Sequence, residues 1–335
     1  MRAPPRKGRK KKPAPAKITL LRGEDALATV TWLYHNRKLT QQQIAKELGV
    51  SRPTVMRLLR QAEDNGLVTV SLRLDILQRV EASRKIADHF GLREVFVVPT
   101  AKTDTPIEVI QAVGRTGALY LQAKLQPDEI LAVAWGKTLL EVARALPDHP
   151  VSGLVIAQSM GGLNSGASAI PSRVTSLVAE RLHARIYHLY VPAIVSTKNL
   201  RDILVADPGI KGALEIARQA TYFMAGIGKI GADATVVEAG FLDMATIDRL
   251  RIRGAVGDIA TRYFDINGNP VRDELEDRIV GLSREDMKQI QTVIGIACGV
   301  DKTNAILGAL RSKLLHVLIL DDQTAFRILK SVEAN

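Results

Sequence analysis

The chain has 335 residues, of which 46% are hydrophobic and 24% are charged, a composition typical of globular proteins at a length that predicts about two domains. No apolar run approaches the roughly 18 residues of a membrane-spanning helix, and the basic N-terminus lacks the apolar segment of a secretory signal. The single cysteine, Cys298, excludes a disulfide within the chain and a zinc site built from cysteines. We therefore expect a cytoplasmic protein with no membrane partner.

The positive charge is concentrated at the N-terminus. The net charge is +11, and residues 1–17 contain eight basic and no acidic side chains, residues 18–75 eight against six, and the remainder 30 against 29. A basic arm, a small basic unit and a nearly neutral body indicate nucleic acid as a partner of the N-terminal part. Residues 1–17, rich in Pro, Gly and Lys, are predicted to form a disordered arm, for which a solubilising tail is the alternative role.

Residues 39–72 carry the signals of a helix-turn-helix. Thr40, with a glutamine three residues later, forms a capping box at the start of a short helix that Gly49 ends. Ser51 is a second N-cap, and apolar residues recur after it at helical spacing. Two helices separated by about three residues are typical of a helix-turn-helix.

The second of these helices has the composition of a DNA recognition helix. Its apolar residues share one face, which leaves the opposite face free for arginine and glutamine side chains that hydrogen-bond guanine and adenine. Its N-terminus suits a phosphate. A solvated basic face on an ordinary helix pair is the alternative. The candidate DNA-binding residues are Ser51, Arg52, Thr54, Arg57, Arg60 and Gln61.

Flanking segments support this DNA-binding prediction. An alternating apolar stretch over 68–72 is expected to form a wing strand, and 24–34 a supporting helix in which Trp32 and Tyr34 pack rather than stack on bases. We predict a winged helix-turn-helix over 18–74 and a linking helix over 75–91. Operator DNA is the expected partner, and a dimer with contacts along the linking helix would present two recognition helices to it.

The body, residues 92–335, alternates apolar strands with helices. Continuous apolar strands separated by helices indicate an α/β fold with a parallel sheet that is covered on both faces. In such sheets ligands bind beyond the carboxyl ends of the strands, so the loops from strand to helix are the candidate sites. The expected strands are 94–99, 129–135, 153–160, 185–192, 221–228, 292–299 and 316–322.

Three of these loops contain groups that suit a small polar ligand. Two of them open a helix with glycine, lysine and threonine, which supply backbone N–H groups, a cation and a hydroxyl for an anion. The third has two glycines, which permit close approach, and an asparagine that can bind hydroxyls. The alternative is that these residues only form turns and caps. The candidates are Gly136, Lys137, Thr138, Gly161, Gly162, Asn164 and Lys302.

A GxGxxG string follows the strand expected at 221–228, but it does not predict a dinucleotide site, because no helix begins within it. Gly226 and Gly228 are instead expected to border a small-ligand cleft. Asp258 is the best carboxylate for binding polyol hydroxyls, with a cap or structural pair as the alternative. The histidines lack metal-ligand spacing, so we predict no metal, no cofactor and no catalytic residue.

Four segments in combination resemble the SorC family of bacterial transcriptional regulators: QQQIAKELGVSRPTVMRLLRQAEDNGLV, AVAWGKTLLEVA, AVGDIATRYFD and GVDKTNAILGAL. The resemblance begins near residue 24. It implies a winged helix-turn-helix and an α/β effector domain similar to sugar-phosphate isomerases and deaminases, in homodimers or homotetramers. It also implies phosphorylated sugars, free sugars or polyols as effectors. By the same resemblance, Gly136, Lys137 and Thr138 fall on a phosphate-loop pattern, Lys302 on a late basic position and Asp258 on an acidic position.

One residue departs from the family pattern. Met160 stands where some members have lysine or arginine, which excludes covalent capture of an aldehyde there and favours a monophosphorylated or neutral polyol effector. We expect a DNA-binding transcriptional regulator whose operator binding is modulated by a small carbohydrate-derived effector. The alternatives are a sugar-phosphate isomerase or deaminase with an appended DNA-binding domain, and a redox sensor that binds NAD through the discounted glycine string.

Overall fold

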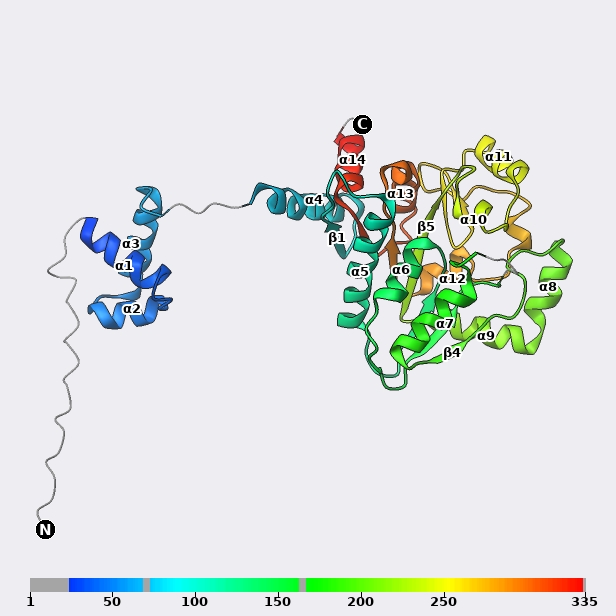
Figure 1. Ribbon diagram of the computed structural model, residues 1–335, viewed down its shortest axis with the longest axis horizontal. Helices are drawn as coiled ribbons and strands as arrows, with labels where there is room; N and C mark the ends of the chain where they lie inside the picture. The colour runs from blue at the N-terminus through cyan, green and yellow to red at the C-terminus, as the bar shows by residue number, and fades with distance from the viewer. Residues whose placement is uncertain (1–23, 69–72, 163–166, 334–335) are drawn as a thin grey trace, which may run out of the picture. The chain divides into compact units, whose positions relative to one another are not determined.

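The computed structural model describes residues 24–68, 73–162 and 167–333. The chain divides into two compact units, with the boundary between Arg73 and Leu74 (Figure 1). The predicted basic arm over 1–17, most of the predicted wing strand over 68–72, and the candidate Asn164 lie outside the described residues. No helix within the described ranges is both long enough and apolar enough to cross a membrane.

The first unit contains three helices around one apolar core. α1 (Glu24–His35), α2 (Gln41–Leu48) and α3 (Arg52–Asp64) contact one another in all three pairings. Their buried side chains recur at helical spacing, so each helix turns one apolar face to the core. These core residues are Leu27, Val30, Leu33, Ile44, Ala45, Leu48, Val55, Leu58, Leu59 and Ala62.

The turn between α2 and α3 is formed by the predicted caps. The Thr40 hydroxyl accepts the N–H of Gln43, and the Gln43 side chain accepts the N–H of Thr40. Gly49 ends α2 with φ 68°, a left-handed conformation that favours glycine. Ser51 caps α3 by accepting the N–H of Thr54. The predicted helix-turn-helix is therefore confirmed.

Two aromatic side chains of α1 do not pack as the sequence analysis predicted. Trp32 is 49% exposed and Tyr34 is 38% exposed, because Val30 and Leu33 belong to the buried face of the helix. The guanidinium of Arg37 lies 5.6 Å from the centroid of the Trp32 ring, a cation–π contact at the surface. The packing prediction for these two residues was wrong.

The second unit is built on a parallel sheet, as predicted. Each residue is buried in three of its strands, β3 (Val155–Gln158), β8 (Thr292–Ile296) and β9 (Val317–Asp321), because helices cover both faces of the sheet. The main strands pair in parallel in the order β1 (Glu94–Val98), β9 (Val317–Asp321), β8 (Thr292–Ile296), β5 (Tyr222–Lys229), β2 (Ile130–Val133), β3 (Val155–Gln158) and β4 (Arg185–Tyr187).

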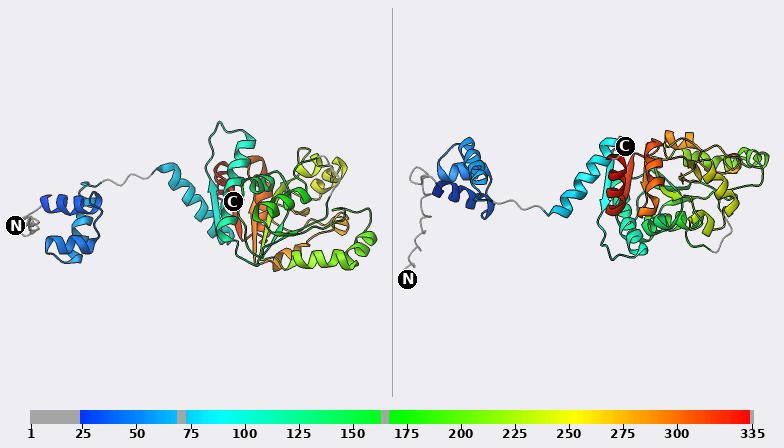
Figure 2. Two further views of the ribbon diagram at one scale, coloured as in Figure 1. Left: turned by 60° about the horizontal axis from the view of Figure 1, so that its bottom comes forward. Right: turned by 90° about the horizontal axis from the view of Figure 1, so that it is seen from above.

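Helices flank this sheet in two groups of neighbours. One group contains α5 (Pro106–Lys124), α6 (Lys137–Ala145) and α7 (Pro171–Leu182). The other contains α4 (Leu74–Phe90), α14 (Asp322–Glu333) and α13 (Thr303–Arg311), and Figure 2 shows α4 beside α14. The predicted linking helix is thus α4, whose buried residues all lie in its C-terminal half, where it contacts β1 and α14.

A smaller lobe with its own apolar core is attached to β5. β6 (Gly257–Ile259) pairs antiparallel with the end of β5, and β7 (Arg262–Phe264) pairs with β6. α10 (Thr235–Glu238) and α11 (Met244–Ile252) contribute to the second apolar core, which also includes Phe241 and Tyr263. The sequence analysis did not predict these elements, because each is too short to show a clear period.

Other segments also depart from the predicted elements. The strand expected over 185–192 stops at Tyr187, and single bridges then join Pro192 to Gly162 and Ile194 to Ile279. The sequence analysis placed no element over α8 (Lys198–Ala206) or α9 (Pro208–Arg218), which contact each other, and none over η2 (Glu276–Arg278) or α12 (Arg284–Gln289).

Candidate functional sites

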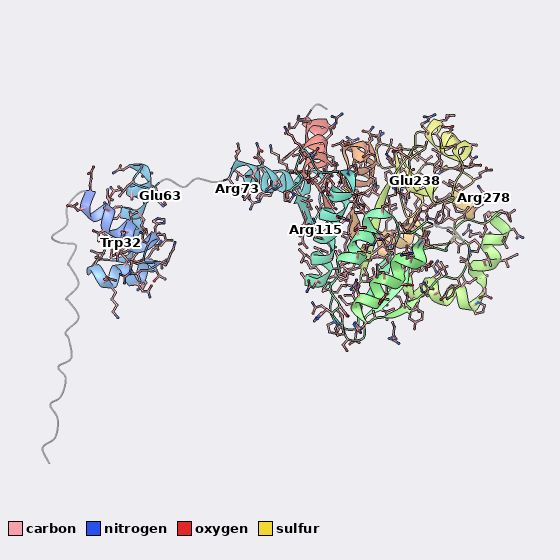
Figure 3. All side chains as sticks on the ribbon, viewed as in Figure 1. Trp32, Glu63, Arg73, Arg115, Glu238 and Arg278 are labelled. Atoms are coloured by element: carbon pink, nitrogen blue, oxygen red, sulfur yellow. The ribbon has the colours of Figure 1, made fainter. Side chains whose placement is uncertain are left out.

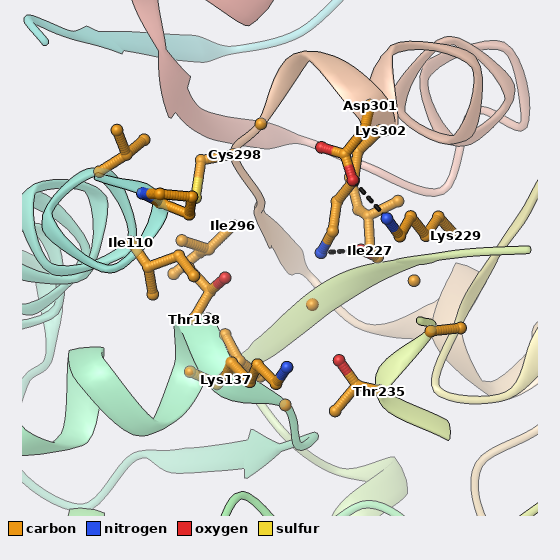
Figure 4. A pocket seen from close by; sticks show the side chains of 18 of the residues that line it. Ile110, Lys137, Thr138, Ile227, Lys229, Thr235, Ile296, Cys298, Asp301 and Lys302 are labelled. Atoms are coloured by element: carbon orange, nitrogen blue, oxygen red, sulfur yellow. Dashed lines mark hydrogen bonds and ion pairs between the residues drawn. The ribbon is translucent and has the colours of Figure 1, made fainter. Parts of the chain in front are cut away.

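A cavity of about 550 Å³ lies at the carboxyl edge of the parallel sheet (Figure 4). Its lining residues follow the ends of β1, β9, β8, β5 and β2, which are adjacent strands. Ligands bind beyond the carboxyl ends of strands in open α/β sheets, so this cavity lies where the sequence analysis placed its candidate site. Of those candidates it brings together Gly136, Lys137, Thr138, Gly226, Gly228, Asp258 and Lys302.

The loop after β2 supplies one wall of the cavity. Gly136 has φ 125°, a conformation that favours glycine, and its carbonyl accepts the N–H of Leu140 in the first turn of α6. The side chain of Thr138 is buried, whereas Lys137 forms an ion pair of 2.5 Å with Glu238 of α10. The loop therefore has the groups predicted for an anion, but a carboxylate already neutralises its cation.

Lys302 reaches the cavity from the strand on the other side of β5. It ends η3 (Val300–Lys302), a short turn between β8 and α13, and not the first helical turn that the sequence predicted. Its ammonium donates to the carbonyl of Ile227 at 3.0 Å. Burial lowers the pKa of Lys302, because burial disfavours the charged form. Among the described residues Lys302 takes part in no ion pair, which leaves its charge available to an anion.

Asp258 enters the cavity from the middle of β6, just before the turn that joins β6 to β7. Ala260 and Thr261 have φ of 49° and 66°, as a tight hairpin turn requires, and the N–H of Thr261 donates to Asp258 Oδ2 at 2.8 Å. A Cβ at Gly228 would lie 1.9 Å from Asp258 Oδ1, so the carboxylate packs on the backbone of β5. Burial raises the pKa of Asp258 to about 6, against the opposing effects of the Thr261 hydrogen bond and the Lys302 charge.

The cavity also contains a charged cluster that the sequence analysis missed. Lys229, the last residue of β5, donates to Asp233 at 2.6 Å and to Asp301 at 2.5 Å. Burial lowers the pKa of Lys229 and these two hydrogen bonds raise it, with a net upward shift. The sequence did contain a signal for this cluster, because the lysine at 229 directly follows Gly228 at the end of a predicted strand.

An aromatic pair joins the cavity to the smaller lobe. Trp135 directly precedes Gly136, lines the cavity and stacks on Phe241, with ring centroids 4.5 Å apart and an angle of 27° between the rings. Phe241 belongs to the second apolar core, against which Trp135 is partly buried. The stacked pair therefore connects the end of β2 to the lobe that carries α10, and the sequence analysis missed it.

The structure does not bring the glycine pair after β3 to this cavity. The N–H of Gly161 donates to the carbonyl of Val280 at 2.9 Å, and that of Gly162 to the carbonyl of Val191 at 2.8 Å. These glycines therefore join β3 to the chain beyond β4. A side chain at position 161 would also collide with the backbone of Pro192, at 2.6 Å.

The described residues offer no metal site, since no group of three or more His, Cys, Asp or Glu among them could hold an ion. Cys298 is buried at the cavity, and burial raises the pKa of its thiol to about 11, so the reactive thiolate is scarce at neutral pH. Gly226 and Gly228 lie within β5, and no helix begins between them. They do not form the phosphate loop of a dinucleotide fold.

α3, the predicted recognition helix, carries the candidate DNA-binding residues on its surface. Its buried face consists of Val55, Leu58, Leu59 and Ala62. The helix ends at Asp64, and Figure 3 labels Glu63 in its last turn. Arg57 donates to Gln61 at 3.0 Å on the outer face, and Arg52 donates to Gln41 of α2 at 3.2 Å. Thr54 is half-buried, and the exposed candidates are Ser51, Arg52, Arg57, Arg60 and Gln61.

Both units match known families. Residues 75–330 match the Sugar-bind model, which describes a sugar-binding domain, and residues 25–73 match the MarR_2 model of the MarR family. The chain is 30% identical over 306 residues to the uncharacterized transcriptional regulator YjhU of Escherichia coli (strain K12). This alignment covers 90% of this chain and 93% of that protein. It is also 30% identical over 295 residues to the deoxyribonucleoside regulator of Bacillus subtilis (strain 168), with 88% and 93% covered.

A solved structure agrees with these sequence relatives. The crystal structure of the full-length sorbitol operon regulator SorC from Klebsiella pneumoniae superposes with a TM-score of 0.70 at 26% identity and covers 90% of this chain and 97% of that chain. These relatives are transcriptional regulators, which disfavours the isomerase or deaminase alternative. With a DNA-binding unit, a sugar-binding unit and relatives of nearly full length, the chain belongs to the SorC family of sugar-responsive transcriptional regulators.

Proposed function

We propose that the cavity at the carboxyl edge of the sheet binds the carbohydrate-derived effector that modulates operator binding by this regulator. The observation that carries the proposal is that Gly136, Lys229, Asp258 and Lys302, from four separate segments of the chain, line one cavity. Together they provide backbone N–H groups, cations and a hydroxyl acceptor at the place where open α/β sheets bind ligands.

The charge pattern favours a phosphorylated sugar or polyol as the effector. Lys302 has no carboxylate partner among the described residues, so a phosphate can take its ammonium without breaking an ion pair. Charge-assisted hydrogen bonds to Lys302 and to the N–H groups at the start of α6 would hold the phosphate. Asp258 can accept hydrogen bonds from hydroxyl groups of the sugar, and Thr138 can donate to or accept from them.

A neutral polyol is the second candidate. Lys137 pairs with Glu238, and Lys229 pairs with Asp233 and Asp301, so carboxylates offset much of the positive charge of the cavity. A ligand without charge would leave these ion pairs intact. It would be held by hydrogen bonds alone, and we therefore expect it to bind more weakly than the phosphate.

Calorimetry on the full chain with matched ligands tests the proposal. We expect sorbitol 6-phosphate or ribose 5-phosphate to bind at least tenfold more tightly than the free sugar or polyol. Lys302→Ala should abolish binding of the phosphorylated ligand. It should also abolish the release or capture of operator DNA that this ligand causes. Lys288→Ala, an exposed lysine of α12, is the matched control. Equal affinities for free and phosphorylated ligands would favour the neutral polyol, and a fully responsive Lys302→Ala protein would contradict the phosphate assignment.

We also propose that the regulator acts in the cytoplasm and that its helix α3 contacts the base edges of operator DNA. We propose further that it acts as a homodimer or homotetramer. The exposed part of α4 carries Leu74, Ile76, Leu77 and Val80, which are between 44% and 66% exposed. Their spacing of three and four residues forms one apolar stripe, which a second copy of the helix would bury. Such a dimer presents two recognition helices to the two half-sites of an operator.

A further inference from the structure

A buried carboxylate at the cavity joins two segments of the chain. Asp321, the last residue of β9, is 2% exposed and lines the cavity. It accepts the N–H of Gly299 at 2.8 Å, and the N–H and the hydroxyl of Thr324 at 2.9 and 2.6 Å. Gly299 directly precedes η3, the turn that ends at Lys302, and Thr324 lies in the first turn of α14. Asp321 therefore connects the turn proposed to hold the phosphate to the start of a helix.

The hydrogen bonds of Asp321 make this connection rigid. A buried charge is strongly unfavourable unless donors surround it, and hydrogen bonds to a carboxylate are about twice as strong as those between neutral groups. Thr324 supplies two of the three donors, so the carboxylate is held mainly by α14. A shift of the Gly299 backbone would leave its N–H without an acceptor unless Asp321 and the first turn of α14 follow.

A second set of hydrogen bonds joins the same helix to the end of β1. The hydroxyl of Thr100, two residues after β1 ends, donates to Asp322 Oδ1 at 2.6 Å. The side chain of Gln323 donates to the Thr100 hydroxyl at 3.2 Å. The first turn of α14 is thus fixed both to the turn that carries Lys302 and to β1.

The linking helix α4 packs against both of these elements. It contacts β1 and α14, and Figure 2 shows it beside α14. Ile86 and Phe90 of α4 belong to the same apolar core as Ala325 and Ile328 of α14. The N-terminal half of α4 carries the apolar stripe that we propose joins two subunits. Hydrogen bonds and packed side chains therefore connect Lys302 to the helix that carries this stripe.

We propose that Asp321 is the positioning residue that couples effector binding to operator binding. A phosphate bound to Lys302 shifts the turn over 299–302, Asp321 transmits this shift to the first turn of α14, and α14 transmits it to α4. Both oxygens of Asp321 already accept hydrogen bonds from the protein, and its charge repels a phosphate, so Asp321 acts through the turn and not on the ligand. This inference rests on the proposed function of the cavity and adds the means by which its occupancy changes the affinity for DNA.

Asp321→Asn tests the coupling. Its Oδ1 still accepts the N–H of Thr324, whereas the amide NH2 presents a donor to the N–H of Gly299, so only the connection to the turn is broken. In calorimetry on the full chain with sorbitol 6-phosphate and ribose 5-phosphate, the dissociation constants should stay within about threefold of the wild type. In fluorescence anisotropy with an operator duplex, the fold-change in operator affinity that the same ligand causes should approach one.

Thr100→Val is the second variant, because it removes the hydroxyl between β1 and α14 at a half-buried position and keeps the shape of the side chain. It should reduce the response to the ligand and leave ligand binding unchanged. Thr175→Val is the matched control, since its hydroxyl donates to the carbonyl of Pro171 on α7, outside the cavity lining. Hydrogen exchange follows the helix directly: the ligand should change exchange in the first turn of α14 in the wild type and the control, but not in Asp321→Asn.

The outcomes separate this inference from the proposed function. An Asp321→Asn protein that binds the ligand and still responds fully would overturn the coupling role. Loss of ligand binding in that variant would overturn it as well, because Asp321 would then belong to the binding contacts, and the proposed function would stand. If Asp321→Asn does not fold, a fully responsive Thr100→Val protein overturns the coupling. If neither phosphate binds the wild type and Lys302→Ala changes nothing, both proposals fail together.

Discussion

Gly228 and Asp258 lie opposite each other in the antiparallel pairing of β5 with β6, and a Cβ at residue 228 would come within 1.9 Å of Asp258 Oδ1. The absence of a side chain at position 228 is therefore what allows the carboxylate to lie over β5 beside the cavity. Gly228, a residue of the GxGxxG string, thus makes room for the carboxylate of a residue 30 positions later in the chain. This role does not involve a nucleotide.

Gly228→Ala should displace Asp258 and impair the effector site. We expect a loss of about 1–3 kcal/mol in the free energy of unfolding, because the added methyl group displaces the carboxylate from its packed position over β5. Effector binding should weaken at the same time. Gly162→Ala is the matched control, since no atom of the described residues lies within 4 Å of a Cβ there, and it should change stability little. Thermal unfolding and calorimetry of both variants decide the comparison, and equal behaviour would refute it.

The half-buried Asp258 should make stability depend on pH. Its pKa of about 6 lies above the ordinary value of 3.8, so the native state holds this proton more tightly than the unfolded state. The resulting stabilisation is complete below pH 3.8 and is lost as the pH rises through 6, a difference of up to about 3 kcal/mol. Asp258→Asn keeps an acceptor for Thr261 but does not ionise. Urea denaturation from pH 4 to 7 should therefore show a smaller decline for the variant, and parallel curves would count against the assignment.

Glu238→Gln should strengthen phosphate binding. The substitution removes the carboxylate that pairs with Lys137 at 2.5 Å and leaves that ammonium free for the ligand. Because the pair is about half exposed, we expect a modest gain, severalfold in affinity for a sugar phosphate and none for the free sugar. Asp248→Asn, which removes an exposed ion pair on α11, is the control. Weaker binding by Glu238→Gln would indicate that this carboxylate itself contacts the effector.

Arg57→Ala should lower operator affinity by about 1–3 kcal/mol and relax the base preference, because Arg57 lies on the exposed face of α3. Affinity for unrelated DNA at the same salt concentration should fall less. Fluorescence anisotropy with operator and scrambled duplexes makes the measurement. An unchanged operator affinity would mean that α3 is not the helix that reads the bases.

Charged residues on the exposed stripe of α4 should separate the subunits. Leu77→Glu combined with Val80→Glu places like charges on the apolar surface that two copies would bury. Sedimentation should show the wild type as a dimer or larger and the double variant as a smaller species with weakened operator binding. Glu81→Ala, an exposed change on the same helix, is the control. A wild type that is monomeric at operator-saturating concentration would exclude the proposal.

Long, regular segments of this chain could be predicted from sequence alone. The capping box at Thr40, the glycine at 49 and the cap at Ser51 each determine a local hydrogen bond, so the helix-turn-helix follows from neighbours in the chain. The apolar strands of the sheet were equally clear, and with them the edge at which the cavity lies. Local patterns therefore predicted both the helix-turn-helix and the edge of the sheet at which the cavity lies.

Contacts between distant segments could not be predicted. The ion pairs Lys137–Glu238 and Lys229–Asp301 join residues 101 and 72 positions apart, so no local pattern indicates them. Gly161 and Gly162 have the composition of a ligand loop, yet their N–H groups pair with Val280 and Val191, on segments with no regular period. Composition indicated which residues could bind a ligand, and only the tertiary arrangement decides which of them do.

The chain has two tryptophans, and each unit holds one of them. Trp32 is 49% exposed on α1 of the DNA-binding unit, whereas Trp135 lines the cavity and stacks on Phe241. Each binding event therefore has its own intrinsic fluorophore. With Trp32→Phe the emission reports the effector cavity alone, and with Trp135→Phe it reports the DNA-binding unit alone. The transfer of the effector signal to the DNA-binding unit can then be timed in one unlabelled protein.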